Sequence, residues 1–246
     1  MPESAPMLVE DVDGVRTITW NRAEALNAMT IEMWHGTRDA LDTAADDGVR
    51  CIVLSGVGRA FTVGQDLGEF ADPRHADPNQ GFRGTMRALE ECAVPMLGAV
   101  DGLAVGFGLT VLAWCDVVVV SSAARFRAPF VGLGVTTEAA ASVALPRILG
   151  DQLATWHLLS GEWLDAATAV GAGLALRLVE DPLAVARDMA GSLAAQPPTA
   201  LRETLTLVRS ARRSGWDKAL EAEYEVMGRL AGGEENLAAI SAFFER

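Results

Sequence analysis

Strand-like patterns in this 246-residue sequence end before residue 138, and helical patterns occupy the rest of the chain. In the first half, short apolar runs alternate with helical periodicity. The clearest run is Val117–Val120, four valines that predict a buried strand. This order predicts an α/β core followed by a helical region. Helices are expected at 138–148, 151–159, 165–171, 182–195, 199–213, 216–231 and 234–244.

Local signals predict the elements of the first half. Asp13 and Gly14 form a favoured tight-turn pair, so a β-hairpin is expected from 8–12 and 15–20. Thr30 is a suitable N-cap for the helix that follows. Buried strands are expected at 51–54 and 96–100, a helix at 84–92, a glycine-rich turn leading into a buried helix at 102–114, and a mobile loop at 69–84.

The charge balance restricts the partners of the chain. It has 20 Lys and Arg against 33 Asp and Glu, a formal net charge of −13. This balance disfavours nucleic acid and anionic membranes as partners. The longest apolar stretch, 102–115, is interrupted by Gly and Thr and is shorter than the roughly 18–20 residues of a membrane span. We expect no nucleic-acid partner and no membrane insertion, and an anionic ligand needs a local basic patch or free backbone N–H groups.

The cysteines and the termini predict the compartment. Cys51, Cys92 and Cys115 are an odd number at wide spacing, and two of them lie in apolar runs. They predict free thiols rather than a disulfide framework, and a cytoplasmic protein. Residues 1–4 lack the basic segment that begins a signal peptide, and residues 244–246 are not a peroxisomal address.

Several common functional motifs are missing from the sequence. His35, His75 and His157 lie far apart in the sequence, so no metal site is expected. No G-x-G-x-x-G follows a strand, and neither G-x-x-x-x-G-K-[ST] nor G-x-S-x-G occurs. The arginine clusters at 125/127 and 209/212/213 are interpreted as solvated helix faces or anion contacts.

Two glycine-bearing turns each follow a predicted strand. The first spans 58–67, and the second spans 101–108 and opens a helix. Tight glycine turns and helix N-termini leave backbone N–H groups free to receive an anion. Two such turns could direct one N–H each at the same oxygen and form an oxyanion hole. Glycine after a strand is also typical of an ordinary turn.

Three segments together resemble the crotonase superfamily, also called the enoyl-CoA hydratase/isomerase family. Residues 21–28 resemble the N-R-P-x-x-x-N-A segment of that family, with Ala23 in place of proline. The turn at 58–67 is similar to its G-x-x-F-x-x-G-x-D-L motif. Residues 94–116 resemble its K-P-x-x-A-x-x-G-x-x-x-G-x-G segment with the Cys-Asp that follows. The resemblance covers nearly the whole chain.

The resemblance implies an α/β crotonase-like spiral of ββα units at 1–190 and a C-terminal helical trimerisation region at 191–246. It implies a homotrimer or a dimer of trimers, and an acyl-CoA thioester substrate with no cofactor beyond its own coenzyme A. By position, the oxyanion donors are the backbone N–H groups of Gln65 and Phe107. Substrate or CoA contacts are expected from Arg22, Ala23, Ala25, Leu26, Val63, Gly64, Asp66, Leu67, Gly106, Thr110 and Phe130, helped by Arg59.

The position of the base separates two branches of the family. The two glutamates of the hydratases correspond to Thr110 and Phe130, and neither of these side chains is a base near neutral pH. Residues 126–142 instead resemble the F-x-x-P-F-x-x-L-G-x-x-x-E-x-x-x-S segment of peroxisomal-type 3-enoyl-CoA to 2-enoyl-CoA isomerases, whose base corresponds to Glu138. A glutamate at the start of a helix is also favoured by the helix dipole alone.

The resulting prediction is an enoyl-CoA isomerase in which Glu138 moves one proton. We expect Glu138 in a mostly apolar pocket with Phe107 and Phe130, where desolvation raises its pKa. One alternative is another crotonase-type lyase, hydratase or hydrolase that uses Asp66 and Thr110. Another is a catalytically silent acyl-CoA-binding protein. The candidates for the acyl pocket are Phe61, Phe70, Phe82, Phe107 and Phe130.

Overall fold

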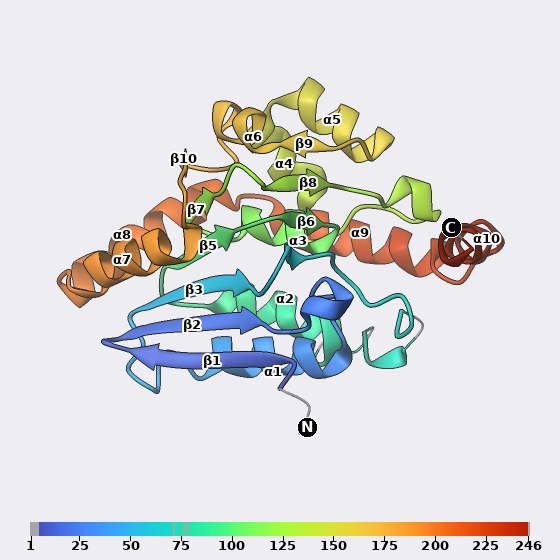
Figure 1. The fold of residues 1–246 in the computed structure, drawn as a ribbon. Coiled ribbons are helices and arrows are strands. Elements are labelled where there is room, and N and C mark those ends of the chain that lie inside the picture. Colours follow the sequence, from blue (N-terminus) through green and yellow to red (C-terminus); the bar gives the residue numbers. More distant parts are fainter. Residues whose placement is uncertain (1–4, 71, 76, 78, 246) are drawn as a thin grey trace.

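Two β-sheets share the strands of the chain, in a computed structural model that describes residues 5–70, 72–75, 77 and 79–245. The larger sheet has the order β1-β2-β3-β5-β7-β10, in which β1 and β2 are antiparallel and the other pairs are parallel. Its strands are β1 (Met7–Val12), β2 (Val15–Trp20), β3 (Cys51–Gly56), β5 (Met96–Val100), β7 (Val117–Val120) and β10 (Arg177–Leu178). Figure 1 shows the strands of this sheet rising from β1 at the bottom to β7 and β10 at the upper left.

The smaller sheet has the order β4-β6-β8-β9, and only its last pair is antiparallel. Its strands are β4 (Ala60–Thr62), β6 (Leu103–Val105), β8 (Arg125–Arg127) and β9 (Leu164–Asp165). The pairs β3 and β4, β5 and β6, and β7 and β8 each send one strand to each sheet, as successive turns of a spiral. The expected α/β spiral is confirmed. These short strands were not predicted, because two or three residues carry no measurable alternation.

Helices connect and cover the sheets. Thr30 caps α1 as expected, since its hydroxyl accepts the N–H of Met33 at 3.3 Å. The helix expected from residue 138 begins only at Ala141, and α2 begins inside the expected loop. The helices are α1 (Ile31–Asp42), α2 (Gly81–Glu91), α3 (Phe107–Thr110), α4 (Ala141–Leu149), α5 (Asp151–Ser160), α6 (Ala166–Ala172), α7 (Pro182–Ala194), α8 (Pro198–Arg212), α9 (Trp216–Leu230) and α10 (Glu234–Phe244).

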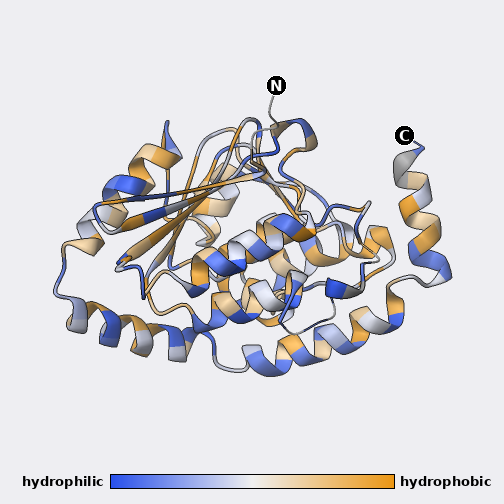
Figure 2. Ribbon diagram, turned by 90° about the horizontal axis from the view of Figure 1, so that it is seen from below, coloured by the Kyte–Doolittle hydropathy of each residue, from blue (hydrophilic) through white to orange (hydrophobic). Residues whose placement is uncertain are grey.

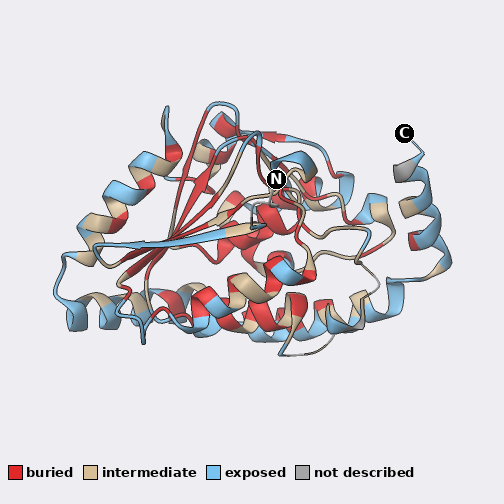
Figure 3. Cartoon of the chain, turned by 60° about the horizontal axis from the view of Figure 1, so that its bottom comes forward, coloured by how far each residue is buried: buried red, intermediate tan, exposed pale blue. Residues whose placement is uncertain are grey.

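The central strands of the larger sheet are buried on both faces (Figure 3), whereas β1 at its edge is mostly exposed. In β3, Ile52 and Leu54 belong to the main core, which includes Trp20, Trp34 and Trp114. Cys51 and Val53 point to the opposite face, which α7 covers. Strands buried on both faces are continuous apolar runs, and this is why the sequence predicted them well.

The C-terminal helices are tied to the core by a buried ion pair. The Arg209 side chain donates to both oxygens of Asp116, at 2.9 and 2.5 Å, and Arg209 is 7% exposed. Arg212 also donates to Asp116, at 3.0 Å. The expected solvated face is therefore wrong for Arg209, because the Asp116 carboxylate beside β7 holds α8 against the core.

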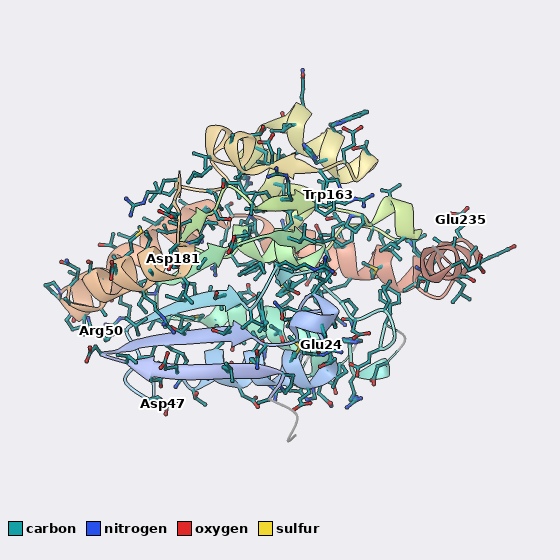
Figure 4. All side chains as sticks on the ribbon, in the orientation of Figure 1. Glu24, Asp47, Arg50, Trp163, Asp181 and Glu235 are labelled. Carbon is teal, nitrogen blue, oxygen red and sulfur yellow. The ribbon has the colours of Figure 1, made fainter. Side chains whose placement is uncertain are left out.

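The last two helices, α9 and α10, extend to one edge of the molecule. Figures 2 and 4 show α10 at this edge. In Figure 4, Glu235 of α10 and Arg50 lie at opposite ends of the molecule. The domain boundary expected after residue 190 falls inside α7 and stays a prediction. Residues 1–4, on which the leader expectation rests, and the side chain of Phe244 lie outside the described residues. No helix in the described part of the chain is long and apolar enough to cross a membrane.

Candidate active site

The two glycine turns lie against each other. A Cβ atom on Gly64 would lie 2.9 Å from the carbonyl oxygen of Val105, in the second turn. Gly64 has φ +82° and Gly106 has φ +57°, a region that residues with a Cβ rarely adopt. The N–H of Gly106 donates to the carbonyl of Arg127 at 2.9 Å, which fixes the second turn to β8. The predicted pair of turns is therefore brought together by β4, β6 and β8.

Two backbone donors are free at this junction. Phe107 is the first residue of α3, and N–H groups in the first turn of a helix have no intrahelical acceptor. Within the described residues, the N–H groups of Gln65 and Phe107 donate to no backbone carbonyl or side chain. These are the two N–H groups that the sequence resemblance proposed as oxyanion donors.

Asn27 joins segment 21–28 to the first turn. It is completely buried, and its amide nitrogen donates to the carbonyls of Ala60 at 2.7 Å and Val57 at 2.9 Å. Its amide oxygen accepts the N–H of Arg22 at 2.8 Å, and its own carbonyl accepts the hydroxyl of Thr62 at 2.6 Å. The two motifs therefore form one hydrogen-bonded unit.

Arg22 and Asp66, both predicted substrate contacts, bind each other. The guanidinium of Arg22 donates to Asp66 at 3.0 Å and to the carbonyl of Ala28 at 2.7 Å. The two side chains are 25% and 24% exposed, so an anionic ligand can still reach this pair. Arg59 is exposed. The other candidates of these segments lie on the same unit, with Ala23 exposed and Ala25, Leu26, Val63 and Leu67 half-buried.

The side chain of Gln65 is held by two aromatic residues. The indole N–H of Trp34 donates to its amide oxygen at 2.9 Å. The amide nitrogen lies 3.0 Å from Nε2 of His75, whose pKa is lowered by burial. The contact of His75 with a site residue was not predictable from the sequence, because it joins a loop to the first turn.

Glu138 precedes an unusual turn. Ala139 and Ala140 both have φ +60°, and the carbonyl of Ala139 accepts the indole N–H of Trp114 at 2.9 Å. The Glu138 residue is partly buried. Burial, helped by the negative charge of Glu223, raises the pKa of Glu138 to about 8. The direction of this change agrees with the expectation from the sequence.

Comparison with known proteins identifies the family. The profile described as enoyl-CoA hydratase/isomerase matches residues 10–246. The chain belongs to the enoyl-CoA hydratase/isomerase family. A probable enoyl-CoA hydratase of Mycobacterium tuberculosis is 34% identical over 244 residues, which cover 96% of this chain and 93% of the relative.

Other members of the family have different names. The 1,2-epoxyphenylacetyl-CoA isomerase of Escherichia coli is 32% identical over 242 residues, covering 93% of this chain and 92% of that protein. The crystal structure of an enoyl-CoA hydratase/isomerase from Pseudoalteromonas atlantica superimposes with a TM-score of 0.93 at 33% identity, covering 98% and 97% of the two chains. The relatives are named for different reactions, so their names do not define the reaction of this chain.

The two positions expected for hydratase glutamates are buried and carry no carboxylate. Thr110 has no exposed surface, and its hydroxyl donates to the carbonyl of Phe107 at 3.4 Å. Phe130 is 6% exposed, and its ring lies 4.0 Å from the position of a Cβ on Gly106. Both side chains lie close to the proposed oxyanion donors without supplying a base.

Aromatic rings connect the turns to α9. The ring of Phe107 lies 4.5 Å from that of Trp34 and 6.1 Å from that of Phe82, which is 6.3 Å from Tyr224. Of the expected acyl-pocket residues, Phe61 is completely buried 4.9 Å from Trp20 and belongs to the core. Phe70 and Phe82 are half-buried and pack on the core from outside.

Glu223 is a residue that the sequence interpretation missed. It lies on α9, is 5% exposed, and accepts hydrogen bonds from Ala140 and Ser142. A signal was present, since Glu223 falls at helical spacing with Trp216, Leu220 and Met227 on the apolar face of this helix. A carboxylate in such a stripe is unusual and indicates a specific partner.

Proposed function

We propose that this protein is an enoyl-CoA isomerase that converts 3-enoyl-CoA to 2-trans-enoyl-CoA, as in the peroxisomal-type isomerases that it resembles. One observation carries the proposal. Glu138 has a pKa raised to about 8, in a chain with Thr110 and Phe130 at the positions of the two hydratase glutamates. A carboxyl group with a pKa near the working pH can both accept and return a proton.

The proposed mechanism uses one base and two backbone donors. The Glu138 carboxylate takes a proton from the carbon next to the thioester carbonyl, and negative charge moves to the thioester oxygen. The N–H groups of Gln65 and Phe107 stabilise that charge, a contribution of roughly 10²–10³ in rate for one donor in known enzymes. The protonated Glu138 then returns the proton to C4. The double bond shifts to C2–C3, and the base is restored.

The proposal also covers the cofactor requirement, the CoA-binding residues and the cellular compartment. Net proton transfer within one molecule changes no oxidation state, so the chemistry needs no metal or redox cofactor beyond the CoA of the substrate. Arg22 and Arg59 are proposed to bind the CoA anion. A cytoplasmic setting is supported by the three buried free cysteines.

We also propose a homotrimer or a dimer of trimers. Large apolar side chains on the C-terminal helices are exposed in the single chain, with Leu207 at 72% and Leu237 at 58%. Exposed residues of this kind on helices beside a complete core favour burial against another copy.

A labelled substrate tests the isomerase directly. The protein is incubated with 3-enoyl-CoA esters of several chain lengths, deuterated at C2, and the product is analysed by mass spectrometry and NMR. We expect the conjugated 2-enoyl thioester with part of the deuterium at C4, because one carboxyl carries the proton between the carbons. In Glu138→Gln the rate should fall by at least ~10², with thioester binding retained. Parental activity in this variant would exclude Glu138 as the base.

Hydration is the second candidate, because a relative that covers most of this chain is named as a probable enoyl-CoA hydratase. In that case Asp66 and Thr110 would place and activate water. Addition of a 2-enoyl-CoA distinguishes the two reactions, since a hydratase forms a 3-hydroxyacyl-CoA. Tight thioester binding with neither product would indicate a silent acyl-CoA-binding protein.

A further inference from the structure

Glu223 binds the segment that follows Glu138 with both of its carboxylate oxygens. One oxygen accepts the N–H of Ala140 at 2.7 Å. The other accepts the N–H of Ser142 at 2.9 Å and the hydroxyl of Ser142 at 2.5 Å. The contact joins α9 to the turn at residues 139–142, and the two segments lie far apart in the sequence.

This turn needs an external partner. Ala139 and Ala140 both have φ +60°, a conformation that is disfavoured for residues with a Cβ. Ala140 is also the N-cap of α4, and its side chain cannot accept a hydrogen bond. Glu223 supplies the missing acceptors, so its carboxylate stabilises the strained turn and the start of the helix together.

A carboxylate at the position of Glu223 costs more free energy than an apolar side chain there would. It lies in the apolar face of α9 with Trp216 and Leu220, where an aliphatic side chain would avoid the desolvation of a carboxylate. Three donors offset part of that desolvation, although burial still raises the pKa of Glu223, and they hold the side chain in one orientation. A group fixed in this way, next to a candidate base, suggests more than a role in stability.

We propose that Glu223 is a positioning residue for the isomerisation, because it fixes the turn that carries Glu138 and places a second carboxylate beside it. This inference rests on the proposed function, in which Glu138 is the base. Glu223 does not touch the reacting atoms in this mechanism; it acts through residues 139–142.

The surrounding charges agree with this role. Burial, with the negative charge of Glu223, raises the pKa of Glu138 to about 8. Tyr224, next to Glu223 on α9, also interacts with the charge of Glu138, and Arg83 of α2 lies 4.2 Å above the Tyr224 ring. Ser142, from α4, donates to the carboxylate of Glu223, so the contact lies between α9 and α4.

Three variants separate positioning from stability. In Glu223→Gln an NH₂ group replaces one of the two acceptor oxygens, so at least one of the two backbone N–H groups loses its acceptor. Ser142→Ala removes only the hydroxyl donor and keeps both backbone contacts. Glu221→Gln makes the same chemical change at an exposed position of α9 and is the matched control.

Two readouts are used for each variant. The titration of Glu138 is followed by infrared spectroscopy of its protonated carboxyl band, assigned by difference from Glu138→Gln, and needs no turnover. The rate of 3-enoyl-CoA isomerisation is measured across pH to give kcat and KM separately.

For Glu223→Gln we expect the Glu138 titration and the acidic limb of kcat to move to lower pH, because a neighbouring negative charge is lost. We expect kcat at its plateau to fall about tenfold with KM within about twofold, since a small displacement of a base slows the chemical step. Ser142→Ala keeps the charge of Glu223, so it should lower kcat by less and leave the Glu138 titration close to that of the parent. Glu221→Gln should match the parent in both readouts.

An unchanged Glu138 titration and kcat in Glu223→Gln, with an active parent, overturns the positioning role alone. If Glu223→Gln does not fold, Ser142→Ala decides instead, and an unchanged kcat in that variant overturns the positioning role. A parent that isomerises no 3-enoyl-CoA overturns the proposed function and the positioning role together.

Discussion

A Cβ atom on Gly64 would lie 3.0 Å from the backbone nitrogen of Phe107. The two turns that carry the proposed oxyanion donors therefore meet backbone to backbone, and no side chain fits between them. The φ of +82° at Gly64 adds a second reason why another residue is strained there. The spacing of the two donors depends on this glycine.

Gly64→Ala should therefore lower kcat/KM for isomerisation by at least about 10²-fold, because separating the turns misplaces one oxyanion donor. The change is measured by the steady-state kinetics of 3-enoyl-CoA. Gly191→Ala in α7 is the control, because a Cβ there meets no atom within 4 Å. That variant should keep the parental rate and gain roughly 0.5–1 kcal/mol in stability. Parental kinetics in Gly64→Ala would contradict the proposed geometry.

The sequence predicted the parts of the fold with strong local signals. The turn at Asp13-Gly14, the cap at Thr30 and the strand Val117–Val120 are all present. The smaller sheet was missed because β4, β6 and β8 have three residues each and pair only through successive turns of the spiral. Such pairing depends on tertiary structure, which overrides local propensity.

The site was predictable only where it lies in contiguous motifs. The segments around Gly64, Gly106 and Glu138 are continuous in sequence, and their arrangement can be compared with a family pattern. Glu223 lies on α9, far along the chain, and its contact with the turn after Glu138 is a tertiary one. Arg209 was misinterpreted for the same reason, because its partner Asp116 lies in another part of the chain.

Arg22→Ala should raise the KM for the CoA ester by about tenfold, since a charge-assisted hydrogen bond to an anion is lost. The ion pair with Asp66 at 3.0 Å means that the anion competes with a carboxylate for this guanidinium. Raising the ionic strength should raise the KM of the parent more than that of the variant. Arg229→Ala removes the same charge from an exposed pair on α9 and is the control. Equal KM values in the parent and Arg22→Ala would exclude this binding site.

The double variant Thr110→Glu/Phe130→Glu, which carries glutamates at both hydratase positions, should have little hydratase activity. Thr110 is completely buried and Phe130 is 6% exposed, so both new carboxylates would be desolvated. We expect a less stable protein and no more than trace 3-hydroxyacyl-CoA from a 2-enoyl-CoA, measured by chromatography. Substantial hydration would show that the site repacks around the new charges.

The assembly can be tested through the exposed face of α10. Light scattering at micromolar concentration should give a mass three or six times 26.0 kDa. Leu237, at 58% exposure, is a candidate contact, and Leu237→Glu should weaken the assembly while the chain remains folded by circular dichroism. A parent that stays monomeric at this concentration would contradict the proposed trimer.

The raised pKa of Glu138 predicts that the base destabilises the fold at alkaline pH. Its pKa is about 8 in the folded protein against an ordinary value of 4.5, so between these pH values the folded state keeps a proton that the unfolded chain has released. The free energy of unfolding of the parent should therefore fall as pH rises from about 4.5 to 8 through this group. Glu138→Gln does not titrate, so it should be more stable than the parent by about 2 kcal/mol at pH 8.5 and nearly equal to it at about pH 4.5, after allowance for the partial exposure of Glu138. Urea unfolding of both proteins at the two pH values measures this difference, with Glu221→Gln as the control for loss of one surface charge. A constant difference between parent and variant across this range would mean that Glu138 is an ordinary solvated carboxylate, too weak a base for the proposed proton transfer.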